Sequence, residues 1–231
     1  MGLRLIVADS AAERAAARAV EARVFLETFG NTPETMAAEY DPYEDRSCFV
    51  VVLDEADGTA CGVARLLVQD DAAEVKTLTD VAREPWSLPL PGTLRAAGLT
   101  GGPIVDVATL AVDARYRRGA GGVEVTLALC HGLYAWARDR GAEALVAVLD
   151  DAVLRLLQSM GIPMDPMPGA TSEFYLGSPA STPAICPIAA VPGSMRTRRP
   201  DLAPAIVDGV FRTVAADPAD LHPDRGLPVP S

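Results

Sequence analysis

The amino-acid sequence predicts an α/β (α+β) fold in which about seven strands form a central sheet flanked by helices. The chain has 231 residues, of which 49% are hydrophobic and 22% charged, so it can bury a sizeable core. Two β-rich runs flank Asp57-Gly58, a dipeptide typical of a tight hairpin turn. A later strand pattern leads into a glycine-rich turn and then into the longest helical pattern of the chain.

The first half of the chain supplies three strands and up to three helices. Ser10 is a good N-cap for an amphipathic helix that ends near Gly30, and Pro33 suits the first position of a second, short helix. A helix is predicted at 75–83, followed by a Pro/Gly-rich segment at 84–102. The strands are predicted at residues 3–8, 47–53 and 59–68.

The second half begins with a strand at 103–112, the glycine-rich turn and a helix that reaches about residue 140. In this helix the spacing of the apolar residues predicts a buried stripe that includes Val123 and Cys130, with His131 on the exposed face. The remaining elements are predicted as strands at 144–149, 172–176 and 184–191 and helices at 151–160 and 200–215. We expect a main domain at 1–191 and, at 192–231, a helical extension with a Pro-rich tail.

The composition excludes several classes of function. The formal net charge of −11 disfavours nucleic acid as a partner. No apolar run is long enough to span a membrane, and the first residues do not resemble a signal peptide, so we expect a cytoplasmic protein. The cysteines form no CxxC pair, which predicts small buried residues and no metal site.

The glycine-rich turn is a candidate anion site. A strand that ends at a helix N-terminus exposes unpaired backbone N–H groups and the positive end of the helix dipole, which suit a pyrophosphate. The turn carries phosphate-pairing charge beside its small residues: Arg115, Arg117, Arg118, Gly119, Ala120, Gly121 and Gly122.

This turn, in its place between strand and long helix, resembles that of the GCN5-related N-acetyltransferases over roughly residues 3–191. Arg118-Gly-Ala-Gly121 matches most of the family's pyrophosphate motif, although Val123 stands where the motif ends in Gly or Ala. The resemblance implies a mixed, mostly antiparallel sheet and a thioester of coenzyme A as substrate. It also implies contacts to that thioester from the strand end at Leu110, Ala111 and Val112. The family's usual general-acid Tyr is replaced by Leu157.

A narrower resemblance, over about residues 22–112, is to the acyl-homoserine-lactone synthases and related N-acyl-amino-acid synthases. It rests on the segments Arg23-Val-Phe25, Glu39-Tyr-Asp41-Pro-Tyr-Glu44-Asp45, Gly62-Val-Ala-Arg65-Leu-Leu67, Leu78-Thr-Asp80-Val81 and Val105-Asp106-Val-Ala-Thr109. Asp106 takes the place of the catalytic Glu, whereas Thr109 replaces an Arg. The resemblance implies substrate contacts from Arg23, Phe25, Phe29, Asp41, Asp45 and Thr109.

Two residues are predicted to be catalytic, each with an alternative. Asp106 lies in an apolar strand, where a raised pKa would suit a base that deprotonates an ammonium group. The alternative is a strand-face carboxylate that pairs with an arginine or faces solvent. Arg65 can bind a substrate carboxylate with two parallel hydrogen bonds, or can form a structural ion pair with Asp41, Glu44 or Asp45.

These observations predict an acyltransferase that moves an acyl group from a thioester to the amine of a small molecule or amino acid. The donor is either acyl-CoA or the pantetheine arm of an acyl carrier protein, which would then be a partner. Two alternatives remain open: a homoserine-lactone-synthase-like enzyme that uses S-adenosylmethionine, and a binding protein that has lost catalysis.

Overall fold

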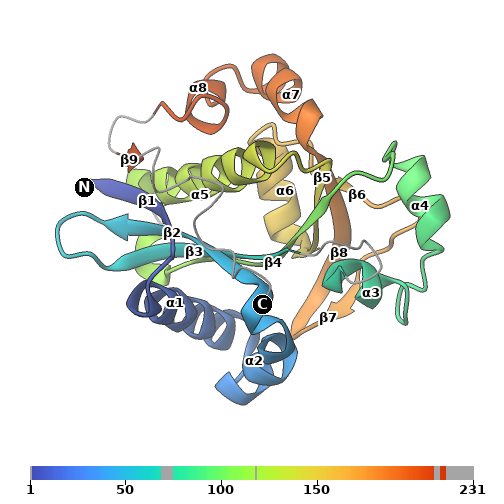
Figure 1. The fold of residues 1–231 in the computed structure, drawn as a ribbon, viewed down its shortest axis with the longest axis horizontal. Helices are drawn as coiled ribbons and strands as arrows, with labels where there is room; N and C mark the ends of the chain where they lie inside the picture. The colour runs from blue at the N-terminus through green and yellow to red at the C-terminus, as the bar shows by residue number, and fades with distance from the viewer. Residues whose placement is uncertain (1, 69–74, 118, 211–213, 217–231) are drawn as a thin grey trace.

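A computed structural model describes residues 2–68, 75–117, 119–210 and 214–216. Within them one nine-stranded sheet runs in the order β6-β8-β5-β4-β3-β2-β1-β9, with β7 paired to β8 (Figure 1). The β1–β9 and β4–β5 pairs are parallel and the other pairs are antiparallel, as predicted for a mixed, mostly antiparallel sheet. The strands are β1 (Leu3–Val7), β2 (Ser47–Asp54), β3 (Ala60–Val68), β4 (Ile104–Val112), β5 (Ala144–Asp150), β6 (Asp165–Pro166), β7 (Glu173–Tyr175), β8 (Ser178–Pro187) and β9 (Val214–Ala216).

Helices cover both faces of this sheet. On one face α5 and α6, together with α7 and α8, bury the largest apolar cluster (Figure 1). On the other face α1 packs on β1–β3, while α3 and α4 lie near β4, β5 and β8. The helices are α1 (Ala11–Phe29), α2 (Pro33–Tyr40), α3 (Lys76–Val81), α4 (Leu90–Ala96), α5 (Gly119–Asp139), α6 (Asp151–Ser159), α7 (Val191–Arg198) and α8 (Ala203–Ile206). Short 3-10 turns occur at Asp41–Arg46, Ala114–Tyr116 and Ile188–Ala190.

The ends of α1 follow the predicted capping chemistry. Ser10 and Glu13 form a reciprocal capping box at its start, and Gly30 ends it in the left-handed conformation, with φ of 72°. Each signal lies within a few residues of the helix end that it marks, which is why the sequence could place this helix accurately.

Strands β4 and β5 separate along their length. They pair over Ile104–Asp106 and Ala144–Val146, and no further pairing joins them beyond that point in the described chain. The register between β3 and β4 also shifts, because Arg65 faces Thr109 whereas Leu66 faces Val107, so Ala108 is an extra residue in β4. The bulge and the separation of the strands together open a gap in the middle of the sheet.

The C-terminal region differs from the prediction. Residues 200–215 were expected to form one helix, but the structure has the short α8 and then β9, which pairs with β1. Pro204 is tolerated in the first turn of α8, and Gly209, with φ of 67°, follows the helix end. Buried Met195 and Ile206 join the main core, while the domain division at residue 191 stays a prediction.

Three further expectations were wrong in detail. Val123 is 55% exposed, so the buried stripe of α5 begins after it. His131 is 7% exposed and not on the surface, because α8 covers it and its Nδ1 lies 2.9 Å from the Ile206 carbonyl. The Pro/Gly-rich segment contains α4, and β6 and β9 were not foreseen because strands this short leave no periodic pattern. The cysteines are all buried, as predicted.

Candidate functional site

A cavity of about 70 Å³ occupies the gap between β4 and β5. Its floor is the β4 segment that contains the bulged Ala108, and its far wall is the end of β5. Helices α1 and α2 and the β7–β8 hairpin complete the lining. The lining residues are Phe25, Phe29, Tyr40, Val107, Ala108, Thr109, Leu110, Val148, Leu149, Asp150, Val153, Tyr175, Leu176, Ser178 and Ser181. We call this cavity the cleft.

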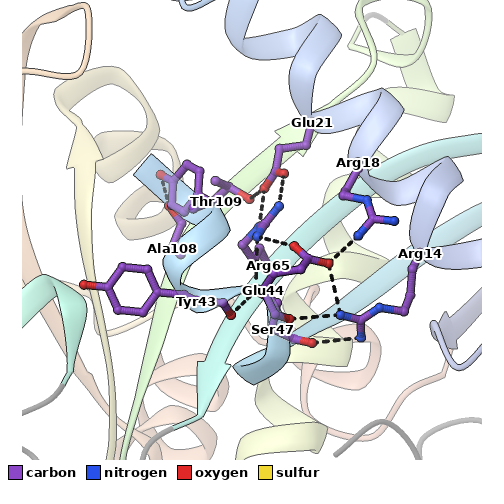
Figure 2. A network of polar contacts seen from close by, with 10 residues as sticks. Arg14, Arg18, Glu21, Tyr43, Glu44, Ser47, Arg65, Ala108 and Thr109 are labelled. Carbon is purple, nitrogen blue, oxygen red and sulfur yellow. Dashed lines mark hydrogen bonds and ion pairs between the residues drawn. The ribbon is translucent and has the colours of Figure 1, made fainter. Parts of the chain in front are cut away.

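Arg65 lies beside the cleft in a buried polar network (Figure 2). Its Nε and Nη2 donate to the two carboxylate oxygens of Glu21 at 3.0 and 2.7 Å, and its Nη1 donates to Glu44 and Ser47. The guanidinium stacks 4.7 Å from the ring centre of Phe49. Arg65 is 3% exposed, and most of its N–H donors already bind other side chains. The structure therefore favours the structural ion pair over a guanidinium that is free to bind a substrate carboxylate.

The partners of Arg65 correct the sequence interpretation. Glu44 was one of the carboxylates proposed, but Asp41 and Asp45 are exposed in the turn after α2 and make no bond to Arg65 in the structure. Glu21, the main partner, was missed. Glu21 lies in the apolar stripe of α1. A buried glutamate is normally paired with a cation, so its position in that stripe could have indicated a buried positively charged partner.

Glu21 connects this network to the cleft through Thr109. The Thr109 hydroxyl donates to the same Glu21 carboxylate that binds Arg65 (Figure 2). Thr109 is a lining residue, so its hydroxyl orientation is set by a chain that runs from Arg65 through Glu21. Arg65 therefore helps to position the wall of the cleft, although its own side chain is not part of the cleft lining.

Asp106 is completely buried and caps a helix. Its two oxygens accept from the backbone N–H and the hydroxyl of Thr77, at 2.6 and 2.9 Å, at the start of α3, where the N-cap Val75 has no polar side chain. Burial raises the pKa of Asp106 to about 6, although the Thr77 hydrogen bonds and Lys76 oppose this. No arginine pairs with it in the described chain, and it does not line the cleft.

A second group of charged side chains lies between α3 and β7, and the sequence analysis did not predict it. The ammonium of Lys76 contacts Asp80 at 2.6 Å, the Tyr175 hydroxyl at 3.0 Å, and Glu39. The Tyr175 hydroxyl donates to Asp80 at 2.6 Å, and burial raises its pKa. The nearby carboxylates outweigh burial and raise the pKa of Lys76. This cluster ties the β7–β8 hairpin to α3 and holds Tyr175 at the edge of the cleft.

Among the described residues that line the cleft, Asp150 is the one with a carboxylate side chain. It ends β5 and N-caps α6, accepting from Ala152 N–H at 2.8 Å, while its other oxygen accepts from Ser178 at 2.8 Å. Sequence reasoning missed it because Asp150-Asp151 reads as an ordinary helix start after a strand. Only the separation of β4 from β5 brings it into a cavity.

The solved structures include chains that share this arrangement. FeeM, an N-acyl amino acid synthase from uncultured soil microbes, matches with a TM-score of 0.62 at 12% identity, over 83% of this chain and 93% of that chain. The acyl-homoserine lactone synthase LasI matches with a TM-score of 0.58 at 16% identity, over 90% and 95% of the two chains. BjaI, a CoA-dependent acyl-homoserine lactone synthase solved with SAM and isopentyl-CoA, gives a TM-score of 0.52 at 15% identity, over 94% and 93%.

The chain has the GCN5-related N-acetyltransferase fold. At these identities the likeness establishes the fold. No family model and no curated protein matches the sequence.

The strand end expected to hold a thioester in this GCN5-related fold lies where β4 is free of β5. Ala111 and Val112 pair with β3, whereas their other edge has no β5 partner. Arg117 follows, with its Nε donating to the Val112 carbonyl at 2.7 Å and its Nη2 donating to Thr28 at 3.2 Å. Helix α5 begins at Gly119. Arg118 lies outside the described residues, and for Gly119, Ala120, Gly121 and Gly122 the structure describes only the helical backbone, so the predicted contacts of these residues stay predictions.

The other predicted substrate contacts divide into two groups. Phe25 and Phe29 line the cleft together, with ring centres 5.6 Å apart. Arg23 instead pairs with Asp113 at 2.9 Å, away from the cleft lining. Asp41 and Asp45 also lie outside that lining.

A second, apolar cavity of about 40 Å³ lies on the α5 side of the sheet. It shares Val107, Leu110 and Leu149 with the cleft and is walled by α5, α6 and the segment that carries α7 and α8. Leu157, at the family's tyrosine position, is one of its buried walls. Cys130 lines it as well, and burial raises the pKa of that thiol to about 12.

Two whole-chain features complete the description. None of the described helices is long and apolar enough to cross a membrane. The described residues contain no group of three or more His, Cys, Asp or Glu side chains arranged to hold a metal ion.

Proposed function

We propose that the protein is an N-acyltransferase that moves an acyl group from a thioester to the amine of a small molecule. The observation that carries the proposal is the gap between β4 and β5, which exposes an unpaired strand edge beside a cavity with polar and apolar walls. The names of the neighbours support it: FeeM is an N-acyl amino acid synthase and BjaI was solved with isopentyl-CoA.

The donor would lie along the free edge of β4. Backbone groups of Leu110, Ala111 and Val112 would hold the pantetheine arm of acyl-CoA or of an acyl carrier protein. The N-terminus of α5, with Arg117 and the residues after it, would receive the pyrophosphate or phosphate. The shared walls Val107, Leu110 and Leu149 would let the acyl chain pass from the cleft into the apolar cavity.

In the reaction, the amine nitrogen bonds to the thioester carbonyl carbon, and a backbone N–H of β4 stabilises the oxyanion that forms. The C–S bond then breaks, the amide is released, and the proton lost by the amine ends on the thiol. Asp106 is the proposed base, since its pKa of about 6 suits proton transfer near neutral pH. Because it is buried behind the cleft, it would act through Thr77 or through water. Arg65 is proposed as a positioning residue.

The test is binding and turnover with the purified protein. Native mass spectrometry and thermal shift are measured against acetyl-CoA, longer acyl-CoAs, an acylated carrier protein and S-adenosylmethionine, and thiol release is followed with an amine mixture present. Binding of an acyl thioester with amine-dependent thiol release supports the proposal. Thioester binding without thiol release would favour the non-catalytic alternative. If none of these compounds binds, thioester binding is refuted.

A further inference from the structure

Five side chains that line the cleft carry a hydroxyl group, and four of these hydroxyls donate their proton to another group of the protein, Ser181 being the fifth. Tyr40 donates to the Ala108 carbonyl at 3.2 Å, Thr109 donates to Glu21, and Tyr175 donates to Asp80. Ser178 donates to Asp150 at 2.8 Å. Since a hydroxyl has a single proton, these groups can offer a ligand only the lone pairs of their oxygens. The side-chain hydroxyls of the cleft are therefore mainly acceptors of hydrogen bonds from a ligand.

Asp150 adds a negative charge to this wall. Its contacts to Ala152 and Ser178 use one lone pair of each oxygen, and a carboxylate has further acceptor capacity. The side chains described as lining the cleft include no Arg, Lys or His that would balance the charge.

The rest of the lining is apolar and favours a ligand with an apolar or aromatic group. Phe25 and Phe29 form a tilted pair on one side, and Val148, Leu149 and Val153 lie on the other. A ligand that fits would carry a hydrogen-bond donor with positive charge at one end and an apolar or aromatic group at the other.

We infer that the acceptor is an apolar or aromatic primary amine without a carboxylate, and that Asp150 binds its ammonium group. This inference rests on the proposed function and narrows its acceptor. An amino acid acceptor would place its own carboxylate among acceptor oxygens and beside Asp150, where like charges repel and no described lining cation compensates.

The experiment compares phenethylamine with phenylalanine, which differ by the carboxylate alone. Isothermal titration calorimetry measures their binding to the wild type without any thioester, and to Asp150→Asn and Asp151→Asn. The asparagine at 150 can still cap α6. Asp151 is the matched control, because it loses the same charge one residue away and bonds to Thr182 and Ser172 outside the cleft.

We expect phenethylamine to bind at least about tenfold more tightly than phenylalanine, and Asp150→Asn to weaken amine binding by about 10- to 100-fold. Asp151→Asn should change it less than about twofold. Equal binding of the two ligands, no phenethylamine binding, or equal effects of the two variants would overturn the inference. An amine that binds but is never acylated refutes the proposed function and leaves Asp150 as the amine site. Efficient acylation of phenylalanine refutes the inference and leaves the proposed function intact.

Discussion

Replacing Arg65 by methionine removes the cation from a buried cluster that holds two carboxylates. Glu44 keeps its contacts to Arg14 and Arg18, but Glu21, which is 3% exposed, keeps only the Thr109 hydroxyl (Figure 2). Breaking a buried pair by removing one partner costs about 3–5 kcal/mol. For a chain of this size each kcal/mol lowers the Tm by about 2–4 °C, so a fall of about 6–20 °C is expected.

A double-mutant cycle tests whether Glu21 is the cause. The free energies of unfolding of the wild type, Arg65→Met, Glu21→Gln and the double variant are measured by urea denaturation, followed by tryptophan fluorescence. Because the double variant leaves no unpaired charge, it should be more stable than the sum of the single effects predicts, by about 2–3 kcal/mol. Additive effects within about 0.5 kcal/mol would refute the coupling through Glu21.

The same double variant separates positioning from chemistry. If it folds and still releases thiol with an altered KM for the amine, Arg65 acts through the cleft wall. If it folds and binds thioester but has lost all turnover, the sequence prediction that Arg65 is catalytic regains support.

Four further predictions follow from single residues. Asp106→Asn should reduce turnover by about 10²- to 10⁴-fold if Asp106 is the base, whereas unchanged turnover would leave it only the capping of α3 at Thr77. The raised pKa of Asp106 (about 6, against 3.8) means that the folded state binds this proton more tightly. Its stabilisation is thus fully present below about pH 4 and is lost as the pH rises through about 6. The stability of the wild type relative to Asp106→Asn should fall by about 2 kcal/mol between about pH 4 and 7, and a flat difference would contradict the assigned pKa. Gly132→Ala would place a Cβ 2.6 Å from a Val50 methyl, where α5 crosses the sheet, and should cost about 1–3 kcal/mol in chemical denaturation; a neutral result would mean that the helix can shift. Leu157→Ala enlarges the apolar cavity, so it should lower stability by about 2–5 kcal/mol and move the preferred acyl-CoA to a longer chain, and an unchanged chain-length profile would place the acyl group elsewhere.

The local elements of this protein could be predicted because their signals are short-range. The capping box of Ser10 and the left-handed Gly30 mark the ends of α1 within a few residues, and the β-rich runs around Asp57-Gly58 make the β2–β3 hairpin. The fold itself was also predicted, through motif resemblance. Errors appeared where tertiary packing overrides periodicity, as at His131, which α8 covers.

The candidate site depended on contacts that the sequence does not encode locally. Arg65 and Asp106 could be singled out because polar residues in apolar strands are conspicuous, whereas Thr109 was singled out through the family resemblance. Their partners Glu21 and Thr77 lie 44 and 29 positions away from Arg65 and Asp106, respectively. Asp150 looks like a routine helix cap in the sequence. It becomes part of the cleft because β5 parts from β4 after a few residues of pairing, and that separation is a property of the whole sheet.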